Sequence, residues 1–264
     1  MRSVERLERQ FAATGPRVPN RLGDLYYLVG HDVDSGRSRV DAASLRLGLS
    51  AAVLLELVTA QHVVVAGEVL VPIRWHEPSE ALGRTVWERL AIAHTRREGP
   101  GNVADWIRFL ALDAVEDVRA RLLAAGWLVT SRTRRWIGGP RVSFVAAERT
   151  TAAAWPPIGL AKALDRGVDA LSLDEVMLAA LVAMTGLLDA VPVLRLDCPG
   201  RDNARAAYER LRRVGQAQAG AARASAGAAT ALDGGWVAAP VMWQVAQVLQ
   251  HTETAVGVGI LAHQ

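Results

Sequence analysis

Residues 22–65 read LGDLYYLVGHDVDSGRSRVDAASLRLGLSAAVLLELVTAQHVVV, and this stretch decides the fold. A short apolar strip over Leu22–Val29 predicts a first helix, and a polar loop over His31–Arg39 follows it. The segment Asp41–Gln61 then carries apolar residues on nearly every side of a helix, which is typical of a buried one. The stretch therefore predicts a central core helix, with β-branched strand residues directly after it.

The rest of the chain continues the helical pattern and adds two hairpins. Valine-rich runs on both sides of Gly67 predict a short hairpin over His62–Val71. A second hairpin is expected over Trp127–Val145, because Gly138, Gly139 and Pro140 suit its turn. Further helices are predicted over residues 79–94, 103–112, 115–125, 172–190 and 202–213, with a last one docking over 240–251 and the tail to Gln264.

These elements indicate a mainly α fold without the strand–helix alternation that builds a parallel sheet. We expect a single helical domain over residues 21–264, built around the buried central helix and carrying a short hairpin and a projecting β-hairpin. Residues 1–20 are expected to form an N-terminal arm. The Ala- and Gly-rich segment 215–234 is predicted to be flexible.

Composition limits the classes of protein to consider. The 264 residues are 51% hydrophobic and carry a net charge of +3, which allows a large core and a mildly basic surface. The N-terminus lacks the apolar segment of a secretory signal, and the longest apolar runs, Leu47–Val58 and Val176–Leu188, are short for a membrane span. Cys198 is the only cysteine, so no intrachain disulfide can form. We expect a soluble or peripheral protein of the cytoplasm.

Motifs for catalysis are not found. His76-Glu77 begins a zinc-helix motif, but Glu80 stands where the second histidine is needed. No nucleophile elbow and no phosphate-binding glycine loop occurs. The six histidines are scattered at positions 31, 62, 76, 94, 251 and 263. We therefore expect no catalytic residue, no metal site, no cofactor and no enzymatic activity.

The second hairpin carries the strongest local signal. Arg132, Arg134, Arg135 and Arg141 surround Trp136 with no acidic residue among them, and Trp136 is the one tryptophan for which the pattern predicts exposure. Guanidinium groups bind phosphates, and a tryptophan ring suits the interface of a membrane, so this segment is a candidate for contact with anionic lipid. A solvated basic hairpin whose tryptophan packs on the body or on another subunit is the plain alternative.

Two more arginines, Arg119 and Arg121, lie on the helix before this hairpin and join the candidate anion-binding residues. A helix followed by a basic hairpin is also the outline of a winged helix, in which the hairpin follows a nucleic-acid backbone. The acidic Glu116 and Asp117 on this helix, together with the low net charge, count against that alternative.

Five segments resemble the Golgi phosphoprotein three-like family, which has bacterial members in actinomycetes. They are GDLYYLVGHDVDSG (23–36), GLSAAVLLELVTAQHVVV (48–65), ADWIRFL (104–110), VRARLLAAGWL (118–128) and DEVMLAALVAMTGLLDAV (174–191), in the family's order. The first two are the most specific.

The resemblance implies a mostly helical domain with a protruding hairpin, here Arg132–Arg141, that serves membrane contact and oligomerisation. Eukaryotic members bind phosphatidylinositol 4-phosphate and recruit glycosyltransferases. Their headgroup pocket uses a tryptophan and an arginine at positions that are Asp41 and Ser50 here. The expected partners are therefore anionic lipids of the inner membrane face, and a protein partner or a second copy of the chain at residues 132–141. Nucleic acid is expected only under the winged-helix alternative.

Overall fold

A computed structural model describes residues 19–32, 34–134, 140–147, 155–195, 202–213, 217 and 241–261 of this chain. The helices are α2 (Leu22–Gly30), α3 (Ala42–Thr59), α4 (Ala81–Arg96), α5 (Val103–Leu110), α6 (Ala114–Ala124), α7 (Trp155–Asp165), α8 (Leu173–Met184), α9 (Leu187–Ala190), α10 (Pro192–Arg195), α12 (Val241–Leu261) and an unlabelled helix over residues 202–213. The strands are β1 (Val63–Ala66), β2 (Val69–Pro72), β3 (Leu128–Arg134) and β4 (Pro140–Ala146). The mainly α fold with two hairpins is confirmed.

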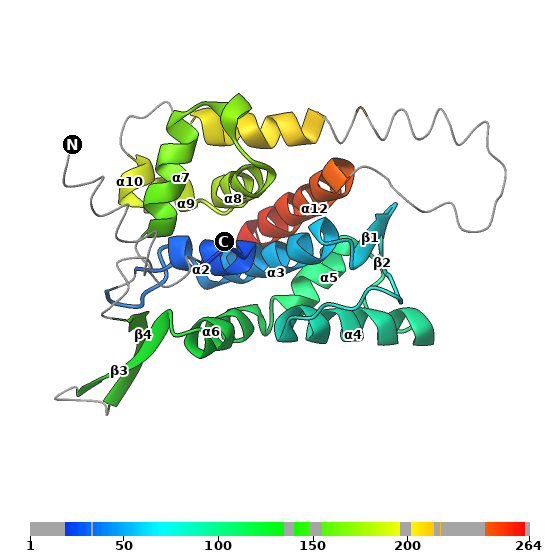
Figure 1. The fold of residues 1–264 in the computed structure, drawn as a ribbon, viewed down its shortest axis with the longest axis horizontal. Helices are drawn as coiled ribbons and strands as arrows, with labels where there is room; N and C mark the ends of the chain where they lie inside the picture. The colour runs from blue at the N-terminus through cyan, green and yellow to red at the C-terminus, as the bar shows by residue number, and fades with distance from the viewer. Residues whose placement is uncertain are drawn as a thin grey trace.

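Helix α3 is the centre of the packing, as its sequence predicts. It contacts α2, α4, α5, α6, α8 and α12, and Figure 1 shows it in the middle of the molecule between α6 and α4 on one side and α8 on the other. Leu49, Leu54 and Leu55 are completely buried. The helix begins where the Asp41 carboxylate accepts a hydrogen bond of 2.8 Å from the Ser44 backbone N–H, which satisfies one of the free donors of its first turn.

Among the described helices, α3 alone is long and apolar enough to cross a membrane. The sequence predicts a shorter apolar core for it, and the structure extends that core to 18 residues. However, 72% of this stretch is buried inside the fold. That burial is typical of a core helix, which covers its apolar surface with neighbouring helices rather than with lipid.

One helix prediction needs correction. The single helix expected over residues 172–190 is two helices, α8 and α9, because Gly186 adopts φ +77° and turns the chain. The Thr185 hydroxyl at this break donates to the Leu181 carbonyl and accepts from Tyr26, so the turn is held by the core. The last helix, expected over residues 240–251 and the tail to Gln264, is α12, and it packs along α3.

Two exposure predictions also need correction. Trp136 is the one tryptophan that the pattern singles out as exposed, yet Trp75 has 89% of its surface in solvent. His31, expected in the surface of a polar loop, is 7% exposed and stacks on Tyr27 with 3.9 Å between ring centroids. Its ring hydrogen-bonds the Tyr27 carbonyl, and burial lowers the pKa of His31 to about 4. His31 is thus a neutral core residue at neutral pH.

Candidate functional site

The β3–β4 hairpin extends away from the helical body next to α6 (Figure 1). Its antiparallel register runs from Leu128 opposite Ala146 to Arg134 opposite Pro140. Leu128 is buried at the base, and Phe144 packs against the core from the second strand. The base of the hairpin is therefore anchored in the body by apolar contacts, while the strands lead outwards.

The loop between α2 and α3 crosses the base of the hairpin at Gly36. A Cβ atom at this position would lie 2.4 Å from the Phe144 carbonyl oxygen, and the φ of +65° is one that side chains disfavour. Glycine is therefore required for this close approach. The loop between α2 and α3 is thus a second element that supports the base of the hairpin.

The predicted contact residues that the structure describes lie on the two strands, towards the far end of the hairpin. The backbones of Arg132 and Arg141 belong to the strands, at positions opposite Val142 and Thr133, and Arg134 ends β3. The side chains of these three arginines, and the whole of Arg135 and Trp136, fall outside the described residues. Their role in anion binding stays a prediction.

Arg119 lies at the junction of α6, α2 and the hairpin. Its Nε donates to the Tyr27 hydroxyl at 3.1 Å, and a terminal nitrogen donates to Glu116 at 2.6 Å. The guanidinium also lies 4.3 Å from the centroid of the Phe144 ring, a cation–π contact with β4. Burial alone would lower the pKa of Arg119, but Tyr27 and Glu116 outweigh it and raise that pKa. Arg119 therefore links the body to the hairpin, and its role as an anion contact stays a prediction.

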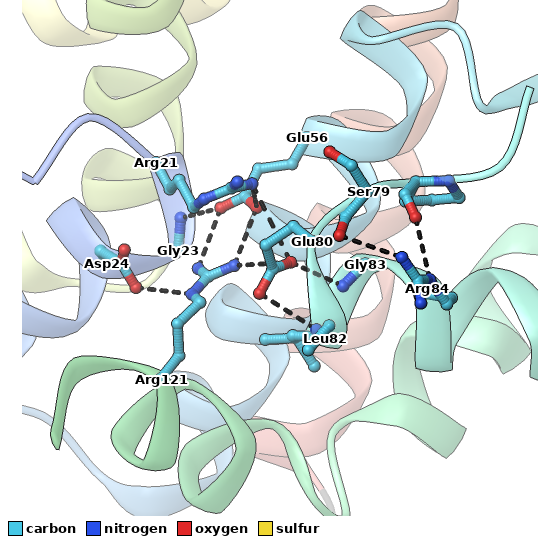
Figure 2. A network of polar contacts seen from close by, with 12 residues as sticks. Arg21, Gly23, Asp24, Glu56, Ser79, Glu80, Leu82, Gly83, Arg84 and Arg121 are labelled. Carbon is cyan, nitrogen blue, oxygen red and sulfur yellow. Dashed lines mark hydrogen bonds and ion pairs between the residues drawn. The ribbon is translucent and has the colours of Figure 1, made fainter. Parts of the chain in front are cut away.

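Arg121, two residues further along α6, lies inside an ion network. Figure 2 shows its guanidinium pointing between α2, α3 and the start of α4. Nε donates to Asp24 at 2.8 Å, and the two terminal nitrogens donate to the two Glu56 oxygens at 3.1 and 3.2 Å. Glu80 lies 3.6 Å away. Only 11% of the Arg121 side chain is exposed, so these contacts are well shielded from water.

The carboxylates of this network also hold backbone groups. Glu56 accepts from the Gly23 N–H at 2.7 Å, near the start of α2 (Figure 2). Glu80 is the N-cap of α4 and accepts from the Leu82 and Gly83 N–H groups. Each acid therefore satisfies a helix terminus in addition to its contact with Arg121, and the network joins α2, α3, α4 and α6.

The pKa values of Asp24 and Arg121 reflect both their burial and the charges around them. Burial raises the pKa of Asp24 to about 6, with a further rise from the Glu56 charge, while Arg121 opposes both. Burial would lower the pKa of Arg121, but Glu56 and Asp24 outweigh it and raise that pKa. Arg21 adds a second, more exposed cation at 3.8 Å from Glu56. Three carboxylates thus face two guanidinium groups.

A bound phosphate would meet an excess of negative charge beside Arg121. The contacts therefore favour a structural role for this residue, and the anion-binding role predicted for it has no support from them. Sequence reasoning missed its acid partners. The available signal is Glu56 itself, because a carboxylate within an otherwise apolar buried helix needs a cation beside it.

The two positions that align with the eukaryotic headgroup pocket have structural roles here. Asp41 caps α3, and the buried Ser50 hydroxyl donates to the carbonyls of Leu47 and Ile107, which ties α3 to α5. In the part of the chain that the structure describes, no group of three or more His, Cys, Asp or Glu side chains is placed to hold a metal ion.

Helix α6 also bears on the winged-helix alternative. Val118 and Leu122 are completely buried, and the helix packs against α2, α3 and α4. A recognition helix must present a face to the major groove. Because Arg119 and Arg121 point into contacts with the body, the arginines of α6 do not form such a face.

Comparisons with known proteins agree with the resemblance noted in the sequence. No curated protein matches the chain. The family model described as Golgi phosphoprotein 3 (GPP34) matches residues 22–241, from the first described helix to the start of α12. The match spans the central helix, the ion network and both hairpins, and the chain belongs to the Golgi phosphoprotein 3 (GPP34) family.

Proposed function

We propose that this protein is a non-enzymatic adaptor that binds anionic lipid at the cytoplasmic face of a membrane through the β3–β4 hairpin. The observation that carries the proposal is the direction of this hairpin, whose strands β3 and β4 extend away from the helical body (Figure 1). In the sequence, residues 132–141 contain four arginines, one tryptophan and no acid. Membership of the GPP34 family supports a lipid-binding adaptor.

Magnitudes support weak, reversible adsorption. An arginine near an anionic bilayer contributes about 1 kcal/mol, and the interaction decays over about 10 Å at 0.1 M salt. Four arginines and one interfacial tryptophan therefore suffice for salt-sensitive binding but not for permanent anchoring. A protein partner or a second copy of the chain at the hairpin would add avidity to such a contact.

Vesicle co-sedimentation tests the proposal. The protein should sediment with vesicles rich in phosphatidylserine, bind pure phosphatidylcholine far less, and dissociate as salt rises from about 0.1 to about 0.5 M. The triple change Arg134→Glu/Arg135→Glu/Trp136→Ala should weaken this binding by about 100-fold or more, since it reverses two charges and removes the ring. Failure of the unaltered protein to bind any anionic vesicle would overturn the proposal.

A matched control separates a local effect from a change in total charge. Arg96→Glu/Arg97→Glu alters the net charge equally at the exposed end of α4. This variant should keep most of the vesicle binding. If both variants lose binding to the same extent, general charge and not the hairpin is responsible. A shift of duplex DNA by the unaltered protein, abolished in the triple variant and without lipid preference, would instead support the nucleic-acid alternative.

A further inference from the structure

Two histidines meet where the first hairpin joins the helical body. His62 comes directly before β1, and His76 lies in the connection from β2 to α4. The β1–β2 ladder pairs Val63 with Pro72, and it continues as the Ile73 N–H donates to the His62 carbonyl at 2.9 Å. This pairing brings the two imidazole rings to 4.4 Å between centroids, at an angle of 55°.

Backbone contacts fix how both rings present their nitrogens. His62 Nδ1 lies 2.7 Å from the His76 carbonyl, and His76 Nδ1 lies 3.3 Å from the Gln61 carbonyl. A carbonyl can only accept, so each Nδ1 carries its hydrogen, and in the neutral ring Nε2 holds a free lone pair. Neither Nε2 has a hydrogen-bond partner among the described residues. Histidines that bind metals show this arrangement, with the second ring nitrogen bonded to a carbonyl.

The spacing of the rings suits a shared ion. Two imidazoles that bind one metal at about 2.0–2.1 Å have centroids about 4.5 Å apart when the bonds meet at a right angle, as in the tetragonal sites of Cu²⁺ and Ni²⁺, and about 5.2 Å apart in a tetrahedral Zn²⁺ site. The observed 4.4 Å is close to the right-angle value and within about 1 Å of the tetrahedral one. His76 is exposed and His62 half-buried, so an ion can reach the pair from solvent.

Contacts within the protein also fix the segment around His76 without a bound ion. The His76 N–H donates to the Ile73 carbonyl at 3.2 Å, and the Arg74 guanidinium donates to Thr95 on α4. Gln61 adopts φ +57°, which ends α3 and places its carbonyl beside His76. Ligands that the fold holds in place bind a metal with a smaller loss of side-chain entropy.

We propose that His62 and His76 chelate one divalent transition-metal ion through their Nε2 atoms. Imidazole ligands suit Zn²⁺, Ni²⁺ and Cu²⁺, with Cu²⁺ bound most tightly in the usual order. No third protein ligand converges with them among the described residues, so the ion keeps positions open for water or for a group on another molecule. The site cross-links the start of β1 to the segment that carries the exposed Trp75.

Asparagine substitutions give a sharp test. The Asn amide nitrogen takes the place of Nδ1 and can still donate to the backbone carbonyl, whereas the ligand at Nε2 is lost. Calorimetric titration of the full-length chain without a histidine tag should show one Zn²⁺ or Ni²⁺ per chain. Each of His62→Asn and His76→Asn should weaken binding about tenfold or more, with an unchanged Tm in EDTA. The control His94→Asn, an exposed histidine on α4, should bind as the unaltered protein does.

Two further measurements test metal binding independently of the calorimetric titration. Metal at about 100 times its Kd should raise the Tm of the unaltered protein by about 5 °C, and this rise should vanish in both asparagine variants. Cu²⁺ should quench a component of the tryptophan fluorescence that Trp75→Phe removes. Equal metal binding by the unaltered protein and the double asparagine variant overturns the proposal, as does the absence of binding by the unaltered protein.

Discussion

Arg121 and the arginines of the second hairpin are close in sequence but differ in their chemical setting. Arg121 is buried among Asp24, Glu56 and Glu80. The segment 132–141 has four arginines and no acid of its own. An arginine whose donors are taken by carboxylates holds helices together, whereas the arginines for which we propose a lipid contact have no acidic neighbour in the sequence. The comparison teaches that neighbours, and not arginine content, separate the two roles.

Removal of Arg121 tests the structural half of the comparison and should have the largest effect. Arg121→Met leaves three carboxylates with Arg21 as the remaining cation of the network. Loss of one partner from a buried ion pair costs about 3–5 kcal/mol, because the other charge stays buried without compensation. Urea unfolding at pH 7 measures this loss.

The control for this variant is a surface pair of the same kind. Arg108 and Asp105 form an ion pair of 3.0 Å, with 42% and 45% of their side chains exposed. Arg108→Met should change the free energy of unfolding by less than about 1 kcal/mol, because water screens the pair. If both variants lose the same free energy of unfolding, the buried Arg121 network stabilises the fold no more than an exposed ion pair does. The contrast between buried and exposed arginines would then be wrong.

The pH dependence of stability sharpens the comparison at Asp24. Its pKa is raised from 3.8 to about 6 by burial, so the folded protein holds this proton more tightly than the unfolded chain does. The resulting stabilisation is fully present below about pH 3.8 and is lost as pH rises through about 6, a change of up to about 3 kcal/mol.

Asp24→Asn removes this dependence and keeps an acceptor for the Arg121 Nε. The variant should therefore gain stability relative to the unaltered protein as pH rises from about 4 to about 7.5, by about 2–3 kcal/mol. Chemical unfolding across that range gives the difference directly. Two curves that stay parallel would show that Asp24 is not desolvated as its position suggests.

Local signals made much of the fold predictable. The all-round apolar pattern of residues 41–61 predicts the central helix, and the helix predicted from residue 172 begins with a capping box between Ser172 and Glu175. The hairpin 127–145 was visible from its β-branched strands and glycine turn. Such features depend on residues a few positions apart, so the sequence displays them directly when local preferences agree with the fold.

The ion network and the histidine pair could not be predicted in the same way. Asp24 and Arg121 are 97 residues apart, and His62 and His76 meet only through the register of β1 and β2. The break at Gly186 is not predictable either. An isolated glycine can lie within a continuous helix, and the sequence does not reveal that its φ is positive. Distant partners follow from tertiary geometry, which the order of residues does not display.

The link between the two regions is the contact of Arg119 with Phe144, and loss of this contact should have the smallest effect. Phe144→Leu keeps an apolar side chain at the hairpin base but removes the ring that faces the Arg119 guanidinium. We expect a loss of about 1 kcal/mol, from the cation–π contact and part of the packing. Hydrogen exchange should quicken at the β3–β4 amides and stay constant at the β1–β2 amides, since opening is confined to the hairpin. Unchanged exchange in β3–β4 would mean that the hairpin keeps its position without the contact between Arg119 and Phe144, and Arg119 would then not couple the helical body to the hairpin.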